Sequence, residues 1–432
     1  MRNLRWITLL ALLALVLAAC GGGGGGGDEP EGTGPAATGA TGEDAQAACD
    51  EDEFGCVEIA DGENVQIGTA LSITGDTASL GLDSQWGAQV AVNFKNDDGG
   101  LFGREIELIN EDAGCAEAED GQAAAQALAA NEQLVAAIGT TCSTTAVPAG
   151  PVLGDQGIVL ISPSNTAPGL TDPEHDQYAG EFFMRTAHND KIQGAAMATF
   201  VCEELGLTNA ATIHDGSPYA DQLQQVFADE FANQCEGEVT SQEAIAPTDT
   251  DFNSVLTTVA GDSPEFLYYP VFHPAGTLLT QQARDFPGLE ETILAAADGL
   301  LVEDLLAQGG DAAEGMYLSG PDLAFSGELY ENEFLPEYQE VSGEESPTSV
   351  FHAHAFDAAN MIFAAVEQVG IEGDDGTLYI PRTELRDAML ATSGFEGITG
   401  TLDCDEFGDC ADARISVSQV EGGEFNRIWP EE

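Results

Sequence analysis

The sequence predicts an α/β protein in which helices cover both faces of mainly parallel sheets. Apolar runs of strand length alternate with amphipathic helical segments about seven times, which is typical of consecutive βαβ units. This periodicity begins near Asn64 and continues for about 365 residues, a length that predicts two domains rather than one. The fold class therefore follows from the alternation and the length together.

Each expected strand is a short apolar run, and the segment after it carries apolar residues at helical spacing. In the first helix, for example, Trp86, Val90 and Phe94 recur along one face. Strands are expected over residues 65–70, 105–110, 134–138, 158–161, 210–214, 238–244, 266–269 and 292–296, with short ones near 400, 416 and 425. Helices are expected over residues 84–96, 116–131, 192–205, 219–233, 252–260, 276–286, 353–369 and 382–390.

Two hydroxyl-rich loops, residues 139–145 (GTTCSTT) and 161–168 (ISPSNTAP), each follow one of these apolar runs. In an open α/β sheet, loops at the carboxyl ends of strands line the ligand crevice. Ser143 and Thr166 can donate to a carboxylate, and the Ser164 carbonyl can accept from an ammonium. The loops therefore predict a site for a free amino acid, with ordinary capped turns as the alternative.

The chain starts with a charged segment, an apolar run over residues 6–17 and the small-residue sequence LAAC that ends at Cys20. This pattern predicts an export signal over residues 1–19, because the apolar run is too short to span a membrane comfortably. Cleavage before Cys20 resembles a bacterial lipobox and predicts lipid attachment there; simple cleavage that leaves an ordinary thiol is the alternative. Residues 20–63 are expected to form a flexible, acidic, Gly-rich tether.

The formal net charge is −65, and removal of the signal takes away Arg2 and Arg5 and no acid, which leaves −67. Such a field repels nucleic acid and anionic lipid surfaces, so a nucleic-acid partner is not expected. Concentrated salt screens self-repulsion of this size, and the charge therefore indicates adaptation to a saline exterior. A surface that gathers cations is the alternative interpretation.

Besides Cys20 the chain has eight cysteines, an even number that favours disulfides in an exported protein. Zinc is disfavoured because no C-x-x-C pair occurs and no histidine lies suitably close. Eight cysteines permit 105 pairings, so the connectivity stays open. Local spacing suggests Cys49–Cys56, Cys115–Cys142, Cys202–Cys235 and Cys404–Cys410.

Outside the poly-glycine run of residues 21–27, the sequence contains no G-x-G-x-x-G, and it has no G-x-x-x-x-G-K-[ST] and no G-x-S-x-G motif. Nucleotide cofactors and a serine-hydrolase elbow therefore have no local support. Residues 403–409 partly match a calcium loop, but Phe407 and Arg414 stand where ligands are needed. We expect no cofactor, no metal site and no enzymatic activity.

Residues 65–171 resemble the amino-acid-binding lipoproteins of ABC importers, the Leu/Ile/Val type of periplasmic binding protein, and the likeness extends over about residues 64–425. The pieces that carry it stand in the order of the family. They are residues 73–75 (ITG), 87–93 (GAQVAVN), 99–104 (GGLFGR), 111–115 (EDAGC), 139–143 (GTTCS), 162–168 (SPSNTAP), 182–186 (FFMRT), 214–219 (HDGSPY) and 268–274 (YYPVFHP).

The resemblance implies a two-lobe fold of the periplasmic binding protein type I, in which three crossings join the lobes. Lobe one is expected to hold residues 64–186 and 316–396, and lobe two residues 187–315 and 397–432. The implied function is capture of an amino acid, branched-chain or similarly small and apolar, and its delivery to an ABC permease. A monomer is expected, with a ligand sensor and an amide- or urea-binding protein as alternatives.

The resemblance also assigns contacts to the ligand head group. By position, Ser143 and Thr166 are expected to bind the carboxylate. The Ser164 carbonyl, Thr166 and Asp298 are expected to hold the ammonium, and Tyr219 closes from lobe two. Asp298 stands where the family usually has glutamate.

Two further positions concern the ligand side chain and the frame of the site. Leu80 and Phe272 stand where aromatic or tyrosyl residues often line the side-chain pocket of the family, so the pocket is expected to be apolar. The pair Cys115–Cys142 matches a disulfide of the family and is expected to brace the Ser143 loop.

Overall fold

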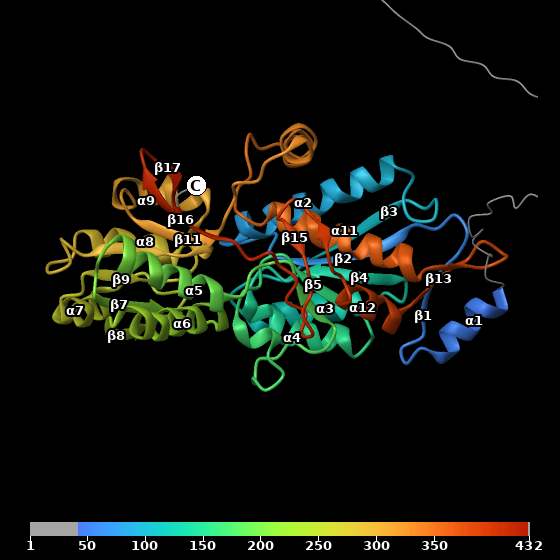
Figure 1. Ribbon diagram of the computed structural model, residues 1–432, viewed down its shortest axis with the longest axis horizontal. Coiled ribbons are helices and arrows are strands. Elements are labelled where there is room, and N and C mark those ends of the chain that lie inside the picture. Colours follow the sequence, from blue (N-terminus) through green and yellow to red (C-terminus); the bar gives the residue numbers. More distant parts are fainter. Residues whose placement is uncertain (1–41, 431–432) are drawn as a thin grey trace, which may run out of the picture. The chain divides into compact units, whose positions relative to one another are not determined.

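The computed structural model describes residues 42–430 and contains two separate parallel-based sheets, each covered by helices (Figure 1). The expectation of an α/β protein with two lobes is confirmed. The export signal and Cys20 lie outside the described residues. None of the helices within residues 42–430 combines the length and the apolar character needed to cross a membrane.

The sheet of lobe one has five strands, all parallel, in the order β3-β2-β4-β5-β6. Its main helices pack in pairs, α2 with α11 and α3 with α4. The strands are β2 (Val65–Leu71), β3 (Ile106–Asp112), β4 (Leu134–Gly139), β5 (Val159–Ser162) and β6 (Phe183–Arg185). The helices are α2 (Ala78–Asp97), α3 (Ala118–Ala129), α4 (Ser143–Gly154) and α11 (His352–Val369).

Strand β5 shows why both faces of this sheet are covered. Val159 and Ile161 pack into the apolar cluster that includes α2 and α11 residues. Ile158, just before the strand, and Leu160 pack into the cluster that includes α3 and α4 residues. Successive strand residues point to opposite faces, so a continuous apolar run must be buried on both sides.

The sheet of lobe two has seven strands in the order β17-β16-β11-β10-β9-β7-β8. Strands β7 to β11 run parallel, and β16 and β17 add antiparallel at one edge. The strands are β7 (Asn209–His214), β8 (Glu238–Ala244), β9 (Phe266–Tyr268), β10 (Ile293–Ala296), β11 (Tyr317–Pro321), β16 (Ile415–Glu421) and β17 (Glu424–Trp429). The helices are α5 (Asp190–Thr199), α6 (Pro218–Cys235), α7 (Asn253–Asp262), α8 (Ala275–Arg284) and α9 (Glu303–Gly309).

Smaller elements complete the fold. A three-stranded antiparallel sheet has the order β1-β13-β12, and β14 pairs with β15. These elements are α1 (Gly42–Glu51), β1 (Cys56–Ile59), α10 (Leu335–Ser342), β12 (Ile371–Glu372), β13 (Leu378–Pro381), α12 (Arg382–Leu390), β14 (Phe395–Glu396) and β15 (Thr401–Leu402).

The structure corrects the expected tether over residues 20–63. Within its described part, α1 and β1 are regular elements, and β1 pairs antiparallel with β13. Val57 and Ile59 are fully buried in the core of lobe one. These two alternate apolar side chains give β1 a buried face, which is why the segment belongs to the folded lobe.

The structure also moves two of the expected lobe boundaries. Strand β11, expected in lobe one, lies between β10 and β16 in the sheet of lobe two. Residues 397–402, expected in lobe two, pack on lobe one: Ile398 and Thr399 donate backbone hydrogen bonds to Asp357 of α11, and Leu402 joins the lobe-one core. Cys410 also joins the lobe-one core, and Asp409 pairs with Arg185 of β6. The second and third crossings therefore come after Pro321 and after Cys410.

All four cysteine pairs suggested by local spacing are disulfides in the structure, which confirms that expectation. Cys49–Cys56 joins α1 to β1, and Cys202–Cys235 joins the segment after α5 to the end of α6. Cys115–Cys142 ties the loop after β3 to the residue that precedes α4. This last bridge fixes the start of α4, where Ser143 stands.

Candidate ligand-binding site

A small cavity of about 10 Å³ between the lobes brings together six of the seven residues expected to bind the ligand. Its volume has room for about one water molecule. The six are Leu80, Ser143, Ser164, Tyr219, Phe272 and Asp298. Thr141, Cys142, Gly299 and Phe351 complete the lining of this inner cavity.

The lobe-one wall of the inner cavity is polar because the chain turns sharply at the end of β4. Gly139 has φ +147°, and a Cβ there would lie 2.4 Å from the Ala70 carbonyl oxygen, so the turn requires glycine. Ser143 begins α4, and its hydroxyl accepts a hydrogen bond from the Ala167 N–H at 3.3 Å. The Ser143 hydroxyl hydrogen thus stays free to donate. The first N–H groups of a helix also favour an anion.

Ser164 uses its side chain to tie the two hydroxyl-rich loops together. Its hydroxyl donates to the Thr141 carbonyl at 2.9 Å, and its N–H donates to the Ser162 hydroxyl at 3.2 Å. The Ser164 carbonyl accepts no hydrogen bond from any residue in the described part of the chain. Because its side chain and N–H are occupied, the carbonyl is the group of Ser164 that remains for a ligand.

The lobe-two wall carries an acid, Asp298, directly after β10, and the side chain is 3 % exposed. Its Oδ1 accepts from the Tyr219 hydroxyl at 3.1 Å and from Gln193 Nε2 at 2.7 Å. Burial raises the pKa of Asp298, and the nearby His188 ring and these two donors oppose the rise. Burial also raises the pKa of Tyr219 well above its usual value, so the phenol stays protonated and acts as the donor.

Thr166 is the expected site residue that does not line the inner cavity. It is 1 % exposed, and its hydroxyl has no hydrogen-bond partner within residues 42–430. Its carbonyl accepts from the N–H of Asp190, a buried acid at the start of α5. The Thr166 hydroxyl therefore belongs to a buried layer behind the cavity wall.

The rest of the inner wall is apolar and comes from both lobes. Leu80 and Phe351 stand on lobe-one segments, yet they pack into an apolar cluster of lobe-two residues. The Phe272 ring lies 5.0 Å from the Tyr219 ring, centroid to centroid. One side of the cavity can thus take an ionic head group, and the other can take an apolar side chain.

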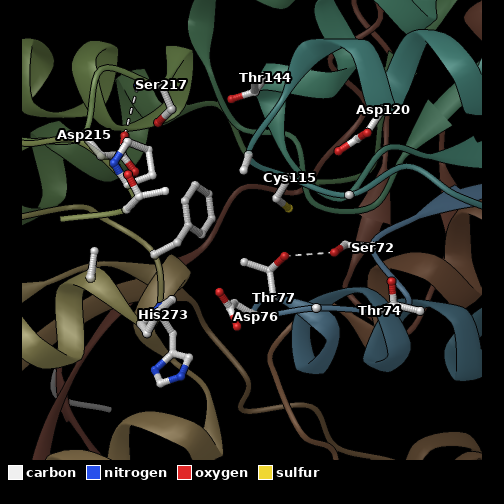
Figure 2. A pocket seen from close by; sticks show the side chains of 18 of the residues that line it. Ser72, Thr74, Asp76, Thr77, Cys115, Asp120, Thr144, Asp215, Ser217 and His273 are labelled. Carbon is white, nitrogen blue, oxygen red and sulfur yellow. Dashed lines mark hydrogen bonds between the residues drawn. The ribbon is translucent and has the colours of Figure 1, made fainter. Parts of the chain in front are cut away.

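A wider chamber of about 700 Å³ adjoins this region and shares Phe272 with the inner cavity. Its size is within the usual range for small-molecule sites. Figure 2 shows polar side chains of the two lobes facing each other across it. From lobe one these include Ser72, Thr74, Asp76, Thr77, Asp120 and Thr144; from lobe two, Asp215, Ser217 and His273.

Residues 64–424 match the sequence model of a family that is described as periplasmic binding protein. The chain belongs to the periplasmic binding protein family. This finding confirms the resemblance seen in the sequence, and the two lobes and the cavity between them are what that resemblance implies.

The relatives of this periplasmic binding protein that follow are named for the amino acids that they bind. The leucine-, isoleucine-, valine-, threonine- and alanine-binding protein of Pseudomonas aeruginosa is 27 % identical over 359 residues, 82 % of this chain and 89 % of that protein. Leu/Ile/Val-binding protein homolog 3 of Brucella melitensis is 26 % identical over 84 % of this chain and 93 % of its own length.

Solved structures agree with the fold. The leucine-binding protein LivK of Thermotoga maritima superposes with a TM-score of 0.73 at 25 % identity, covering 84 % of this chain and 97 % of that one. LivJ of Streptococcus pneumoniae in complex with isoleucine gives 0.71 at 24 % identity, covering 85 % of this chain and all of that one.

Sequence reasoning missed two kinds of site residue. Phe351 completes the apolar wall, but it stands at the entry to α11, more than fifty positions after Asp298. Gln193 holds Asp298 from α5. The sequence signal for Gln193 is its spacing: it lies four positions before the apolar Met197 and so shares a helix face with it, and the structure shows that both are buried.

Proposed function

We propose that this protein captures an amino acid with a small apolar side chain between its lobes and delivers it to an ABC permease. The observation that carries the proposal is the single cavity where an acid, a helix N-terminus with a free hydroxyl, and an apolar wall meet. The names of the relatives support the same ligand class. We assign no reaction to the protein.

In this proposal the two charged groups of the ligand contact different lobes. The carboxylate binds Ser143 and the N–H groups at the start of α4, with Thr166 behind them. The ammonium binds Asp298 and the Ser164 carbonyl, and Tyr219 holds Asp298 in place. Because the two partners lie on opposite lobes, an amino acid stabilises the closed arrangement by bridging them.

The apolar side chain of the ligand contacts Leu80, Phe272 and Phe351. Binding requires the inner cavity to widen, since about 10 Å³ does not hold an amino acid. A rotation about the three crossings separates Leu80 and Phe351 from the lobe-two residues that they contact. Entry is through the wider chamber, which shares Phe272 with the inner cavity.

The test is calorimetry of the full mature protein with L-leucine, L-isoleucine and L-valine. We expect at least one to bind, and Ser143→Ala to weaken that binding by about 1.5–3 kcal/mol, because a donor to a charged group is lost. Thr248→Ala is the matched control: Thr248 is exposed in the wider chamber and absent from the inner cavity. Absence of binding for all three amino acids would contradict the proposed function.

We also propose that Cys20 carries a lipid that holds the protein at the outer face of the cytoplasmic membrane, where it acts as a monomer. The small-residue sequence before Cys20 supports lipid attachment, and the family supports a place outside the cytoplasm. Mass spectrometry of the N-terminal peptide tests the anchor, and Cys20→Ala is expected to release the protein in soluble form.

We propose that the acidity is an adaptation to high salt. With a net charge of −67 after removal of the signal, stability should rise as NaCl increases from about 0.1 M to about 1 M, because the screening length falls from about 10 Å to about 3 Å. The melting temperature by circular dichroism measures this. Converting exposed Glu331, Glu333 and Glu340 to glutamine should reduce the gain. A melting temperature that stays level with salt would argue against the adaptation.

A further inference from the structure

Behind the cavity wall, a series of buried polar groups connects Asp298 to the first crossing, which is the segment between β6 and α5 that contains His188. Gln193 of α5 donates from Nε2 to Asp298 Oδ1 at 2.7 Å and to the Ser319 hydroxyl of β11 at 3.1 Å. Its Oε1 is hydrogen-bonded to His188 Nε2. All of these residues are buried, so the three hydrogen-bonded partners fix the position of the Gln193 amide.

The direction of each hydrogen bond follows from the chemistry of Asp298. A carboxylate accepts and cannot donate, so the NH₂ group of Gln193 must face it. Gln193 Oε1 then faces His188, and His188 Nε2 must carry a hydrogen. Burial lowers the pKa of His188, so the ring is neutral. The donors therefore point in sequence from His188 through Gln193 to Asp298, an arrangement that stabilises negative charge on Asp298.

A second buried acid makes this stabilisation necessary. Asp190 is fully buried on α5, three positions before Gln193, and neither carboxyl oxygen has a hydrogen-bond partner within the described chain. Burial raises the pKa of Asp190 well above its usual value, and the charge of Asp298 raises it further. Asp298 accepts two hydrogen bonds, whereas the contacts of Asp190 are weaker: His188 Nε2 lies 4.0 Å from its Oδ1, and the Thr166 side chain lowers its pKa only in part. The two donors favour the negative charge on Asp298, and burial disfavours a charge on Asp190.

The other titratable groups near the two acids are accounted for in the same way. Tyr219 of α6 and Tyr268 of β9 are buried phenols whose pKa values burial raises, so they stay neutral. Arg185 of β6 lies near enough to act on His188 and Asp190. His354 of α11, close to His188, has its pKa lowered by burial to about 3 and is neutral.

We propose that Gln193 is a positioning residue of the ammonium site, which occupies Oδ1 of Asp298, leaves Oδ2 for the ligand, and connects the site to the first crossing. Oδ2 of Asp298 takes part in no hydrogen bond with residues 42–430, although Asp298 lines the inner cavity. The inference rests on the proposed function for the identity of the ligand group, but the contacts that fix Gln193 do not depend on it.

The first measurement needs no ligand. In protein with carbon-13 at the aspartate carboxyls, the Asp298 signal is assigned by its loss in Asp298→Asn and is then titrated by NMR. Gln193→Met keeps a side chain of similar length and removes the hydrogen bonds to Asp298, Ser319 and His188. We expect the pKa of Asp298 to rise in this variant, because a donor to the charged form is lost.

Gln224→Met is the matched control. Gln224 is also a buried glutamine of lobe two, and it bonds Thr212 and Asp221 without contacting Asp298. It should lower stability without moving the Asp298 titration. If Gln193→Met does not fold, His188→Phe tests the same series of hydrogen bonds. It leaves Gln193 in place and removes the hydrogen bond to Gln193 Oε1. The pKa of Asp298 should then also rise, but by less than in Gln193→Met.

The second measurement is calorimetry with L-leucine and with 4-methylpentanoate, the same skeleton without the amine. Gln193→Met should weaken L-leucine binding about tenfold or more and change 4-methylpentanoate binding far less. An unchanged Asp298 titration in Gln193→Met would overturn the role of Gln193. Failure of the unaltered protein to bind amino acids would instead contradict the proposed function, while the titration still decides the role of Gln193.

Discussion

Asp298→Asn is expected to weaken the binding of L-leucine at least about tenfold, or about 1.4 kcal/mol. The variant keeps the shape of the side chain and part of its acceptor capacity, and it deletes the charge. A ligand ammonium buried in this cavity needs an anionic partner, because an uncompensated buried charge costs several kcal/mol. Calorimetry at neutral pH measures the loss.

The comparison of L-leucine with 4-methylpentanoate, a ligand without an amine, tests the role of Asp298 more specifically. Binding of 4-methylpentanoate should fall far less, since this ligand has no ammonium to neutralise. Asp215→Asn is the matched control, because Asp215 is likewise a buried acid of lobe two but lines the wider chamber rather than the inner cavity. Equal losses for both ligands, or none for either, would mean that the ammonium does not contact Asp298.

Arg185→Met is expected to lower the free energy of unfolding by about 3–5 kcal/mol, because it leaves buried polar partners unpaired. Arg185 is fully buried and pairs through Nε with Asp409 Oδ1 at 2.6 Å. Its other nitrogens donate to the carbonyls of Asn165 and Ala167 and to the Thr171 hydroxyl. The guanidinium thus joins the loop before the third crossing to the loop that carries Thr166.

Urea unfolding with and without the substitution measures this effect. Burial works to raise the pKa of Asp409, but Arg185 and the hydrogen bonds to Asp409 hold it below its usual value. A carboxyl group whose pKa is lower in the folded than in the unfolded protein stabilises the fold at every pH above its unfolded-state pKa. This stabilisation is lost as the pH falls through the folded-state pKa. The loss in Arg185→Met should therefore be large at neutral pH and smaller at acid pH.

Arg414→Met serves as the control for Arg185. Arg414 pairs with Asp412 at 3.4 Å and donates to the Thr399 carbonyl at 2.7 Å, but its side chain is 52 % exposed. An exposed pair of this kind contributes about 1 kcal/mol or less. If the two substitutions cost the same, the Arg185 network would not hold the crossing and the Thr166 loop together.

Much of the architecture could be predicted because its causes are local. The expected helix over residues 382–390 matches α12, and each of the four disulfides joins a cysteine to the next one along the chain. The expected helix over residues 84–96 was too short: α2 begins at Ala78, where Ser79 and Gly81 weaken the apolar pattern. Helix α4 was not predicted, because Pro148 and Pro151 stand inside it and proline is typical of helix ends.

The placement of β11 could not be read from local pattern. Five residues of this strand lie between β10 and β16, and pairing with β16 joins positions about a hundred residues apart. A short apolar strand can complete either sheet, and the order of crossings decides which. The same reason explains β1, whose partner β13 comes more than three hundred positions later.

The sequence by itself determined the strand–helix alternation, the hydroxyl-rich loops after β4 and β5, and the acid after β10, since each depends on neighbouring residues. Only the tertiary structure decided that Ser143, Ser164 and Asp298 meet in one cavity, that Thr166 lies behind its wall, and that Gln193 holds the acid. These relations join residues of different lobes or elements. The packing of the crossings sets such distances, and no local periodicity records them.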